Sequence, residues 1–406
     1  MSLHGQLSTL ATSDLLIQAK KSTLHTAIRP DIIMERGSGL YVWDTEGKAY
    51  LDFIGGWAVN ALGHSPAVIS EALNEQAARL VNSSPSFYNK PMVEFARLLT
   101  EITCFDKVFF TSSGAEANES AIKLARKHGS KNLGSAYEII TLVNGFHGRT
   151  LAAMSATGKK QWQLLFEPKV SGFKHVPIND AEALNHAINE NTCAVMLELV
   201  QGEGGVHSVD ADYLKLVRKA CDDHGLMLII DEIQTGIGRT GKMFAYEHYG
   251  ILADVMTLGK GIGGGFPLAA MLTTETFDIF DAGDQGGTYS GQPLAMAVGL
   301  AVVNEVIQRN LPLHAEIQGE YIQERLHQIS PIFQLSRIRG KGLLLAFDLP
   351  SDKGAELVAE CLKEGLLINS PNPNTIRLMP PLVVTKDEID QMILLLCHAL
   401  NRVLTN

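Results

Sequence analysis

Short runs of large apolar residues alternate with amphipathic segments through the middle of the chain. Uninterrupted apolar runs at residues 226–230 and 255–258 are typical of strands that are buried on both faces of a sheet. A helical pattern precedes the first run, over about residues 211–224. Strand and helix patterns alternate in this way through the middle of the chain, which predicts a mostly parallel sheet with helices on both faces, an α/β fold. Further strands are expected at residues 108–111, 138–143 and 194–200.

The pattern changes towards the N-terminus. Residues 39–52 alternate apolar and polar positions around an Asp-x-x-Gly turn at Asp44, which predicts a β-hairpin. Residues 67–103 show helical periodicity instead. One buried helix face is expected there, formed by Ile69, Leu73, Ala77 and Leu80.

The C-terminal quarter alternates in another way. After a glycine-rich loop at residues 284–292 and an alanine-rich helix over 293–309, the order becomes helix, two strands, helix, strand, helix. This order predicts a smaller α+β domain. We therefore expect a large α/β domain over residues 61–309, a small domain over 310–406, and an N-terminal arm with an antiparallel segment, 1–60, that belongs to the small domain.

Composition narrows the class of protein. With 406 residues, 46% of them apolar, the chain can bury a large core. A net charge of −10 argues against a nucleic-acid partner, and the apolar runs fall short of the roughly 20 residues that a membrane helix needs. Residues 1–12 lack the features of a targeting segment, so we expect a cytoplasmic protein. Five widely spaced cysteines suggest neither a disulfide framework nor a zinc site.

Two strand ends carry candidate chemistry. Asp231 closes the apolar run at 226–230, and Lys260 follows the run at 255–258 between two glycines. Asp231 could simply cap a helix, and a lysine in a loop is often only a solvated charge. An acid and an amine at neighbouring strand ends would suit a cofactor that needs a covalent amine and a counter-charge, as pyridoxal phosphate does. Gln234 could then reach the hydroxyl of the cofactor ring.

Two other motifs fit the same hypothesis. Ser113, Gly114 and Ala115 follow a predicted strand and open a helix, which makes either a tight turn or an anion site for a phosphate. Phe146 and Arg149 lie among glycines. Either the ring is packed in the protein and the arginine is a surface charge, or the ring stacks on a ligand and the guanidinium binds a carboxylate.

A nucleotide-binding protein is the alternative from a different class. Residues 236–241 and 259–264 both match G-x-G-x-x-G, and residues 236–242 match the spacing of a phosphate-binding loop. The first motif begins five residues after Asp231, the second runs into Gly265-Phe266-Pro267 where a helix should open, and the third is followed by Met243 instead of Ser or Thr. We therefore reject these nucleotide sites.

From about Ile33 to Leu400 the chain resembles the class III (subgroup II) aminotransferases that use pyridoxal phosphate, in particular the acetylornithine and ornithine aminotransferase group. Five motifs occur in the family's order: residues 113–119, 145–150, 201–205, 231–236 and 260–267. The resemblance implies the PLP-dependent transferase fold type I, with a mostly parallel seven-stranded sheet in the large domain and a smaller α+β domain. It also implies a homodimer with shared active sites.

The resemblance assigns roles by matching motif. Lys260 would bind the cofactor covalently and later carry a proton, Asp231 would face the pyridine nitrogen, and Gln234 the ring oxygen. Phe146 would stack on the ring, and Thr288 would reach the phosphate of the neighbouring subunit. The phosphate would also be held by Ser113, Gly114 and Ala115. The residues expected to bind the substrate are Tyr41, Tyr88, Arg149, Glu203 and Arg377.

The implied reaction moves the δ-amino group of N2-acetyl-L-ornithine to 2-oxoglutarate, giving N-acetyl-L-glutamate 5-semialdehyde and L-glutamate in arginine biosynthesis. The Phe146-His147 pair resembles the bacterial acetylornithine type. Tyr41 and Tyr88 instead resemble positions at which ornithine aminotransferases keep tyrosines. Ornithine, succinylornithine, succinyldiaminopimelate, 4-aminobutyrate and putrescine therefore remain alternative donors.

Overall fold

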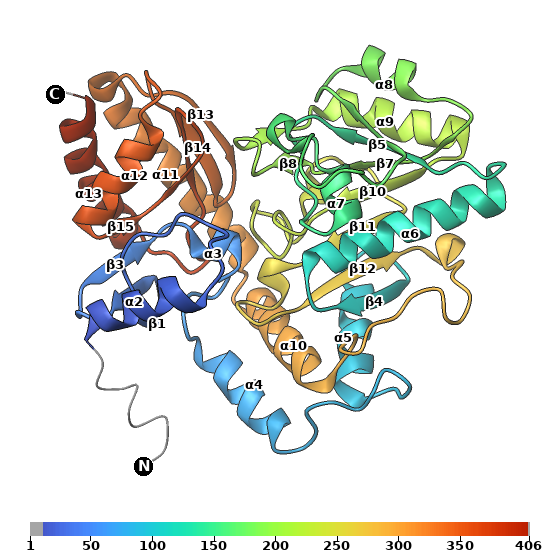
Figure 1. Ribbon diagram of the computed structural model, residues 1–406, viewed down its shortest axis with the longest axis horizontal. Coiled ribbons are helices and arrows are strands. Elements are labelled where there is room, and N and C mark those ends of the chain that lie inside the picture. Colours follow the sequence, from blue (N-terminus) through green and yellow to red (C-terminus); the bar gives the residue numbers. More distant parts are fainter. Residues whose placement is uncertain (1–10, 405–406) are drawn as a thin grey trace.

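The computed structural model describes residues 11–404, which form a larger lobe and a smaller one (Figure 1). The larger lobe comes from the middle of the chain, and the smaller lobe contains both ends of the described chain. The expectation that residues 1–12 carry no targeting segment falls almost entirely outside the described residues. No helix within 11–404 is long and apolar enough to cross a membrane.

A seven-stranded sheet forms the centre of the larger lobe, in the order β4-β12-β11-β10-β7-β5-β6. Six of the strands are parallel to one another, and only β12 runs antiparallel to its neighbours β4 and β11. The prediction of a mostly parallel sheet is confirmed. The strands are β4 (Lys107–Thr111), β5 (Glu138–Leu142), β6 (Phe173–Val176), β7 (Thr192–Leu197), β10 (Met227–Asp231), β11 (Val255–Leu258) and β12 (Ala269–Thr273).

The uninterrupted apolar run of β10 is explained by helices on both faces of the sheet. Leu228 and Ile230 join the core that contains α9 (Ala211–His224), whereas Met227 and Ile229 join the core that contains α6 (Gly114–Asn132). Side chains of a strand alternate between faces, so a strand covered on both faces must be apolar throughout. α7 (Leu151–Ala156) packs beside α6, and α8 (Ala181–Ala187) packs beside α9.

The helical segment at 67–103 differs from its prediction. It forms two helices, α4 (Ala67–Ala77) and α5 (Lys90–Glu101), and no residue of α4 is fully buried. α4 packs against α10 (Pro293–Gln308), and only Ile69 and Leu73 of the predicted face reach the core. Ala77 is exposed and Leu80 lies beyond the end of α4, so the expected buried face over all four positions is wrong.

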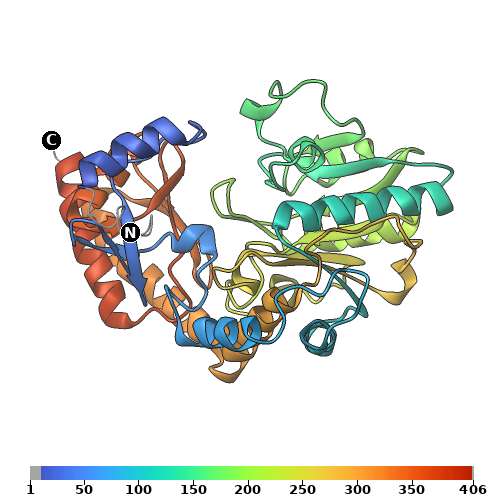
Figure 2. The same cartoon turned by 60° about the horizontal axis from the view of Figure 1, so that its bottom comes forward.

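The smaller lobe combines two four-stranded sheets with three long helices (Figure 2). One sheet has the order β13-β14-β17-β16, as expected for an α+β unit. Its strands are β13 (Ser336–Lys341), β14 (Leu344–Asp348), β16 (Asn369–Asn372) and β17 (Thr375–Leu378). Its helices are α11 (Leu311–Phe333), α12 (Gly354–Glu364) and α13 (Lys386–Leu404).

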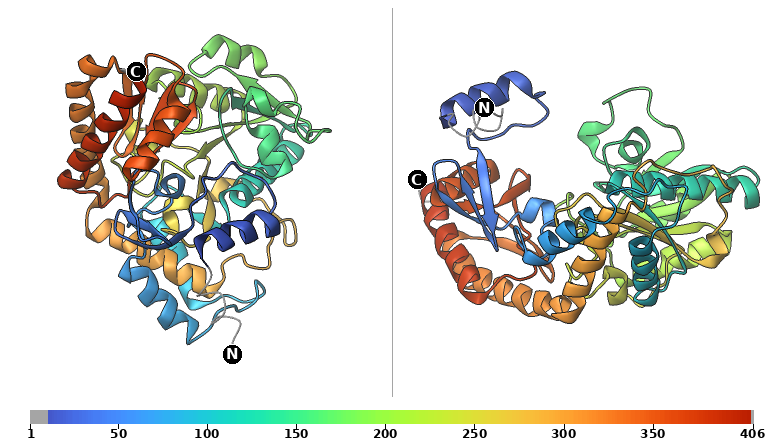
Figure 3. Two further views of the ribbon diagram at one scale, coloured as in Figure 1. Left: turned by 60° about the vertical axis from the view of Figure 1, so that its left-hand side comes forward. Right: turned by 90° about the horizontal axis from the view of Figure 1, so that it is seen from below.

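The second sheet of the smaller lobe joins the two ends of the chain. The predicted hairpin is present as β2 (Tyr41–Asp44) and β3 (Ala49–Asp52), with β1 (Met34–Ser38) added beside β2. β15 (Leu366–Leu367) pairs in parallel with β3. In the right panel of Figure 3, α10 and α11 run from one lobe to the other, and α2 (Thr12–Ser22) projects from the small lobe.

Candidate active site

Three parallel strands bring their carboxyl ends together at one edge of the large sheet. β10 lies between β7 and β11, with Ile230 beside Leu197 and Asp231 beside Thr257. The residues that follow these strands therefore share one crevice, which is where open α/β sheets bind ligands. Glu198, Asp231 and Lys260 come together there, so the predicted pairing of the two strand ends is confirmed.

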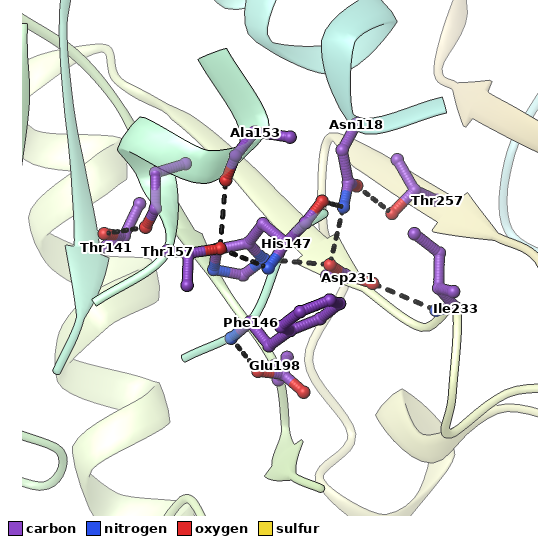
Figure 4. A network of polar contacts seen from close by, with 11 residues as sticks. Asn118, Thr141, Phe146, His147, Ala153, Thr157, Glu198, Asp231, Ile233 and Thr257 are labelled. Atoms are coloured by element: carbon purple, nitrogen blue, oxygen red, sulfur yellow. Dashed lines mark hydrogen bonds and ion pairs between the residues drawn. The ribbon is translucent and has the colours of Figure 1, made fainter. Parts of the chain in front are cut away.

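Asp231 is held by a buried polar network (Figure 4). Its Oδ2 accepts a hydrogen bond from Asn118 Nδ2 at 2.8 Å and lies 2.8 Å from His147 Nδ1. Its Oδ1 accepts from the backbone N–H of Ile233 at 3.0 Å. The residues directly after Asp231 form turns and not an α-helix, so the alternative that it caps a helix is wrong. The carboxylate is instead fixed in place, with a buried charge partner at one side.

Asn118 and His147 are themselves fixed by their neighbours. Asn118 Nδ2 also donates to the carbonyl of His147 at 2.7 Å, and Thr257 Oγ1 donates to Asn118 Oδ1 at 2.8 Å. The backbone N–H of His147 donates to Thr157 Oγ1 at 2.9 Å. Burial opposes protonation of His147, but its hydrogen bond to Asp231 and the charge of that carboxylate outweigh burial and raise the pKa of the imidazole.

Glu198 is a second acid at this edge. Burial raises the pKa of its carboxyl to about 7, even though the backbone N–H of Phe146 donates to Oε1 at 2.8 Å. Glu232, the neighbour of Asp231, has a structural role instead. Its carboxylate accepts from the backbone N–H groups of Ala245 and Tyr246, so it points away from the crevice.

Lys260 presents its amine to the same cavity. Burial, together with the nearby positive charge of Arg377, lowers the pKa of the Lys260 amine to about 8. Three carboxylates, led by Glu203, act in the opposite direction but do not cancel this effect. A lysine with a lowered pKa has a larger neutral fraction at physiological pH, which makes it a better nucleophile and base.

The cavity around Lys260 has a volume of about 300 Å³ and is large enough for a small cofactor. It brings together eight of the residues that the sequence selected. Arg149 is exposed on its outer side, with its guanidinium carbon 4.5 Å from the centre of the Trp162 ring. The eight predicted residues that line the cavity are Gly114, Ala115, Phe146, Arg149, Glu203, Asp231, Gln234 and Lys260.

The N-terminus of α6 forms one end of this cavity. Ser113 caps the helix, since its Oγ accepts from the backbone N–H of Glu116, but Ser113 itself is not part of the cavity wall. The first N–H groups of a helix have no acceptor within the helix, which leaves those of Gly114 and Ala115 available for an anion. A Cβ at Gly114 would come within 2.9 Å of Ile233, so glycine lets the helix start close to the strand end.

Unpaired polar atoms in the described residues surround the cavity. His147 Nε2, Gln234 Oε1 and Arg377 Nη1 are buried and lack a hydrogen-bond partner within residues 11–404. Gly202 leaves room for Gln234, because a Cβ there would lie 1.6 Å from Oε1. Buried polar groups are normally hydrogen-bonded, so such orphans indicate a missing polar ligand.

Glu203 and Arg377 form an ion pair beside the cavity. Arg377 Nη2 lies 2.7 Å from Glu203 Oε1, and Arg377 Nε donates to Asn369 Oδ1 at 2.9 Å. Although burial raises it, the pKa of the Glu203 carboxyl is lowered to about 2 by Arg377 and by Lys159. Glu203 is therefore fully ionised at neutral pH, and its charge cancels that of the buried guanidinium.

Apart from Ser113 and Arg377, which adjoin this cavity, three predicted residues lie outside it in their own chain. The Tyr41 hydroxyl donates to Gln391 of α13 at 2.7 Å, and Tyr88 is 89% exposed. Thr288 is exposed in the glycine-rich loop that precedes α10. Tyr88 lines another cavity together with Gly286 and Gly287 of that loop. The roles predicted for Tyr41, Tyr88 and Thr288 therefore stay predictions.

Sequence reasoning missed four residues of the site. Glu198 is the one acid within the predicted strand 194–200, but only the pairing of β7 with β10 places it at the same sheet edge as Asp231. His147 and Asn118 stood in recognised motifs, but nothing in the sequence showed that they contact Asp231. Lys159 carried no signal, and only the fold places it 3.0 Å from Glu203.

Comparisons with known proteins agree with this geometry. The family model described as aminotransferase class-III matches residues 24–400. Acetylornithine aminotransferase of Caldanaerobacter subterraneus subsp. tengcongensis is 46% identical over 391 residues, covering 96% of this chain and 100% of that protein. Acetylornithine aminotransferase of Ralstonia nicotianae is 48% identical, covering 95% of this chain and 97% of that protein.

Solved structures give the same result for the fold. Ornithine aminotransferase of Toxoplasma gondii superposes with a TM-score of 0.93 at 30% identity, covering 98% of this chain and 97% of that one. Acetylornithine aminotransferase of Elizabethkingia anophelis has a TM-score of 0.87 at 33% identity, covering 97% and 100%. The fold is the PLP-dependent transferase fold type I.

Aminotransferases of this class use pyridoxal 5′-phosphate, and the cavity fits it. Its walls offer free N–H groups at a helix start, a fixed carboxylate, an orphaned amide oxygen and a lysine with a lowered pKa. With a family model that matches nearly its whole length, the chain belongs to the class III aminotransferases and is a pyridoxal-phosphate-dependent enzyme.

Proposed function

We propose that this enzyme transfers the δ-amino group of N2-acetyl-L-ornithine to 2-oxoglutarate, giving N-acetyl-L-glutamate 5-semialdehyde and L-glutamate in arginine biosynthesis. The observation that carries the reaction type is the shared crevice of Lys260 and Asp231, with the Glu203–Arg377 pair at its side. The choice of donor is supported by relatives that are 46–48% identical over nearly the whole chain and are named acetylornithine aminotransferases.

Each residue of the cavity has a part in this proposal. The bound cofactor supplies an aldehyde carbon that takes the amino group and a ring that withdraws electrons from the substrate carbon. Asp231 would keep the ring nitrogen protonated, and Gln234 Oε1 would accept from the ring hydroxyl. Phe146 would stack on the ring. The phosphate would bind at the start of α6, to Ser113, Gly114 and Ala115.

Lys260 would perform the proton transfers. Its Nζ would take the proton from the amine-bearing carbon of the substrate and hold it for return, as a base with a pKa near the working pH does best. Arg149 would hold a carboxylate of the substrate. Glu203 neutralises Arg377 while a donor without a second carboxylate is bound, and it must release Arg377 when 2-oxoglutarate enters.

Quaternary structure and location belong to the same proposal. We place the enzyme in the cytoplasm as a homodimer with shared active sites, in which Thr288 reaches the phosphate of the neighbouring subunit. The exposed positions of Thr288 and Tyr88, outside the cavity of their own chain, support this arrangement. The division into 1–60, 61–309 and 310–406 is also kept, supported by the pairing of β3 with β15.

A donor panel tests the substrate assignment. With enzyme carrying pyridoxal phosphate, acetylornithine is expected to bleach the visible cofactor band faster than ornithine in single-turnover mixing. The reason is that Tyr41, which would bind a free α-amino group, does not line the cavity of the described chain and donates its hydroxyl hydrogen bond to Gln391. Faster bleaching by ornithine would favour the second candidate, an ornithine aminotransferase, which Tyr41, Tyr88 and the solved structures of ornithine aminotransferases support. The panel also includes succinylornithine, succinyldiaminopimelate, 4-aminobutyrate and putrescine.

The pH dependence of cofactor capture tests the state of Lys260. Its pKa is lowered to about 8, so its neutral, nucleophilic fraction in the apoprotein grows as the pH rises towards 8 and levels off above it. We expect the rate of reconstitution with pyridoxal phosphate to rise about tenfold per pH unit below this value and then to flatten. A rate that still rises at that slope up to pH 10 would mean that the amine has an ordinary pKa.

A further inference from the structure

Glu203 has two cationic partners, and the second one has no role so far. Lys159 Nζ lies 3.0 Å from Glu203 Oε2, on the oxygen that Arg377 does not contact. The side chains of Lys159 and Glu203 are only 14% and 20% exposed. Lys159 precedes the short 3₁₀ helix η1 (Lys160–Trp162), far in the sequence from Arg377 of β17.

The backbone around Glu203 is fixed from the other side. Arg339 Nε donates to the carbonyl of Gly205 at 2.9 Å, and Asn372 Nδ2 donates to the carbonyl of Gly204 at 3.0 Å. Both of these residues belong to the small lobe, as does Arg377. A movement of the Glu203 carboxylate away from Arg377 therefore has to be a rotation of its side chain, with the backbone in place.

A dicarboxylate substrate makes such a movement necessary. If a carboxylate of 2-oxoglutarate binds Arg377, the carboxylate of Glu203 is a like charge at hydrogen-bond distance from the same guanidinium. If Arg377 were the only partner of Glu203, moving this largely buried carboxylate away would be costly, because it would lose its charge-assisted hydrogen bonds without gaining full hydration. Lys159 removes this cost, since it already holds the other oxygen.

Resting on the proposed function, we infer that Lys159 is a positioning residue that retains Glu203 when 2-oxoglutarate occupies Arg377, and so favours the dicarboxylate half-reaction. It acts through Glu203 and does not need to contact the substrate. The donor half-reaction, in which Glu203 stays on Arg377, does not depend on Lys159. The two half-reactions should therefore respond differently to its removal.

The orientation of Lys159 is set by aromatic rings. Its ammonium lies 5.4 Å from the centre of the Phe146 ring and 5.3 Å from that of Trp162, within cation–π distance of both. Phe146 lines the cavity, so loss of the whole side chain could disturb the cofactor. Lys159→Met keeps a long apolar chain against both rings and removes only the charge, which makes it the informative substitution.

The experiment measures both half-reactions separately by single-turnover absorbance in holoenzyme. In Lys159→Met, the KM for 2-oxoglutarate should rise about tenfold, while the donor half-reaction with acetylornithine stays within about twofold of wild type. Lys159→Arg keeps the charge and should recover most of the 2-oxoglutarate KM. Lys160→Met is the matched control, because Lys160 is the exposed neighbour, and it should change neither half-reaction.

A double-mutant cycle decides whether Lys159 acts through Glu203. In a Glu203→Ala background, Lys159→Met should have no further effect on the 2-oxoglutarate KM, because the carboxylate that it retains is absent. An equal loss in both half-reactions, no recovery in Lys159→Arg, or an undiminished effect in Glu203→Ala would overturn the inference. If the wild-type enzyme reacts neither with any of the amino donors nor with 2-oxoglutarate, the proposed function is overturned instead.

Discussion

Lys260→Ala is expected to abolish transamination, lowering kcat by about 10³-fold or more, because one substitution removes both the covalent anchor of the cofactor and the proton carrier. The amine lies in the cavity at the end of β11, and burial lowers its pKa to about 8. Within the cavity wall no other lysine is present to replace it. After borohydride reduction, mass spectrometry should find the cofactor attached to the wild-type peptide that contains Lys260 and to no peptide of the variant.

Two further measurements make this test specific. Lys242→Ala removes an exposed lysine from the glycine-rich segment after Gln234 and should leave kcat unchanged. Lys260→Ala should still bind pyridoxal phosphate without a covalent bond, since the other contacts of the cavity remain, and an added small primary amine should restore part of the activity. Covalent attachment that persists in Lys260→Ala would place the reactive amine elsewhere.

The large sheet could be predicted because its strands are buried on both faces. Short uninterrupted apolar runs such as residues 226–230 favour strands of this kind, and helical periodicity between them supplied the alternation. β6 and β12 were not found, because neither contains an uninterrupted run of large apolar residues: Lys174 and His175 interrupt β6, and β12 begins with two alanines. The error at 67–103 arose because apolar spacing indicates which residues share a helix face, but not whether the chain itself covers that face.

The sequence indicated which residues of the site lie at strand ends, but not which strand ends lie side by side. The sequence places Asp231 and Lys260 at strand ends, but strand order is a property of the fold, so the position of Glu198 beside them became visible only with β7 next to β10. The same limit applies to Lys159, which contacts one oxygen of Glu203 within the larger lobe, while Arg377 of the smaller lobe contacts the other oxygen. The end of β10 carries two neighbouring acids. Asp231, the one selected from the sequence, lines the cavity, whereas Glu232 accepts hydrogen bonds from backbone N–H groups.

Asp231→Asn is expected to lower kcat by about 10²- to 10³-fold while the enzyme still folds and still binds the cofactor to Lys260. The amide has nearly the same shape as the carboxylate but only one oxygen, so it keeps the acceptor for Ile233 or the one for Asn118, and not both. The larger loss is the negative charge, and with it the group that would keep the pyridine nitrogen protonated. The change should therefore appear in the rate of proton removal, measured as a deuterium isotope effect on single-turnover bleaching.

A matched carboxylate elsewhere separates this effect from loss of stability. Asp254 lies at the opposite end of β11, where it accepts from the backbone N–H of Leu228 at 2.7 Å and pairs with Arg218 at 3.0 Å. Asp254→Asn should lower the melting temperature without changing kcat per cofactor-loaded subunit. Loss of its negative partner should also lower the pKa of His147 in Asp231→Asn, because the charge of Asp231 is what raises this pKa against burial. A kcat within about threefold of wild type in Asp231→Asn would mean that the charge at this strand end holds His147 and Asn118 in place and takes no part in the chemistry.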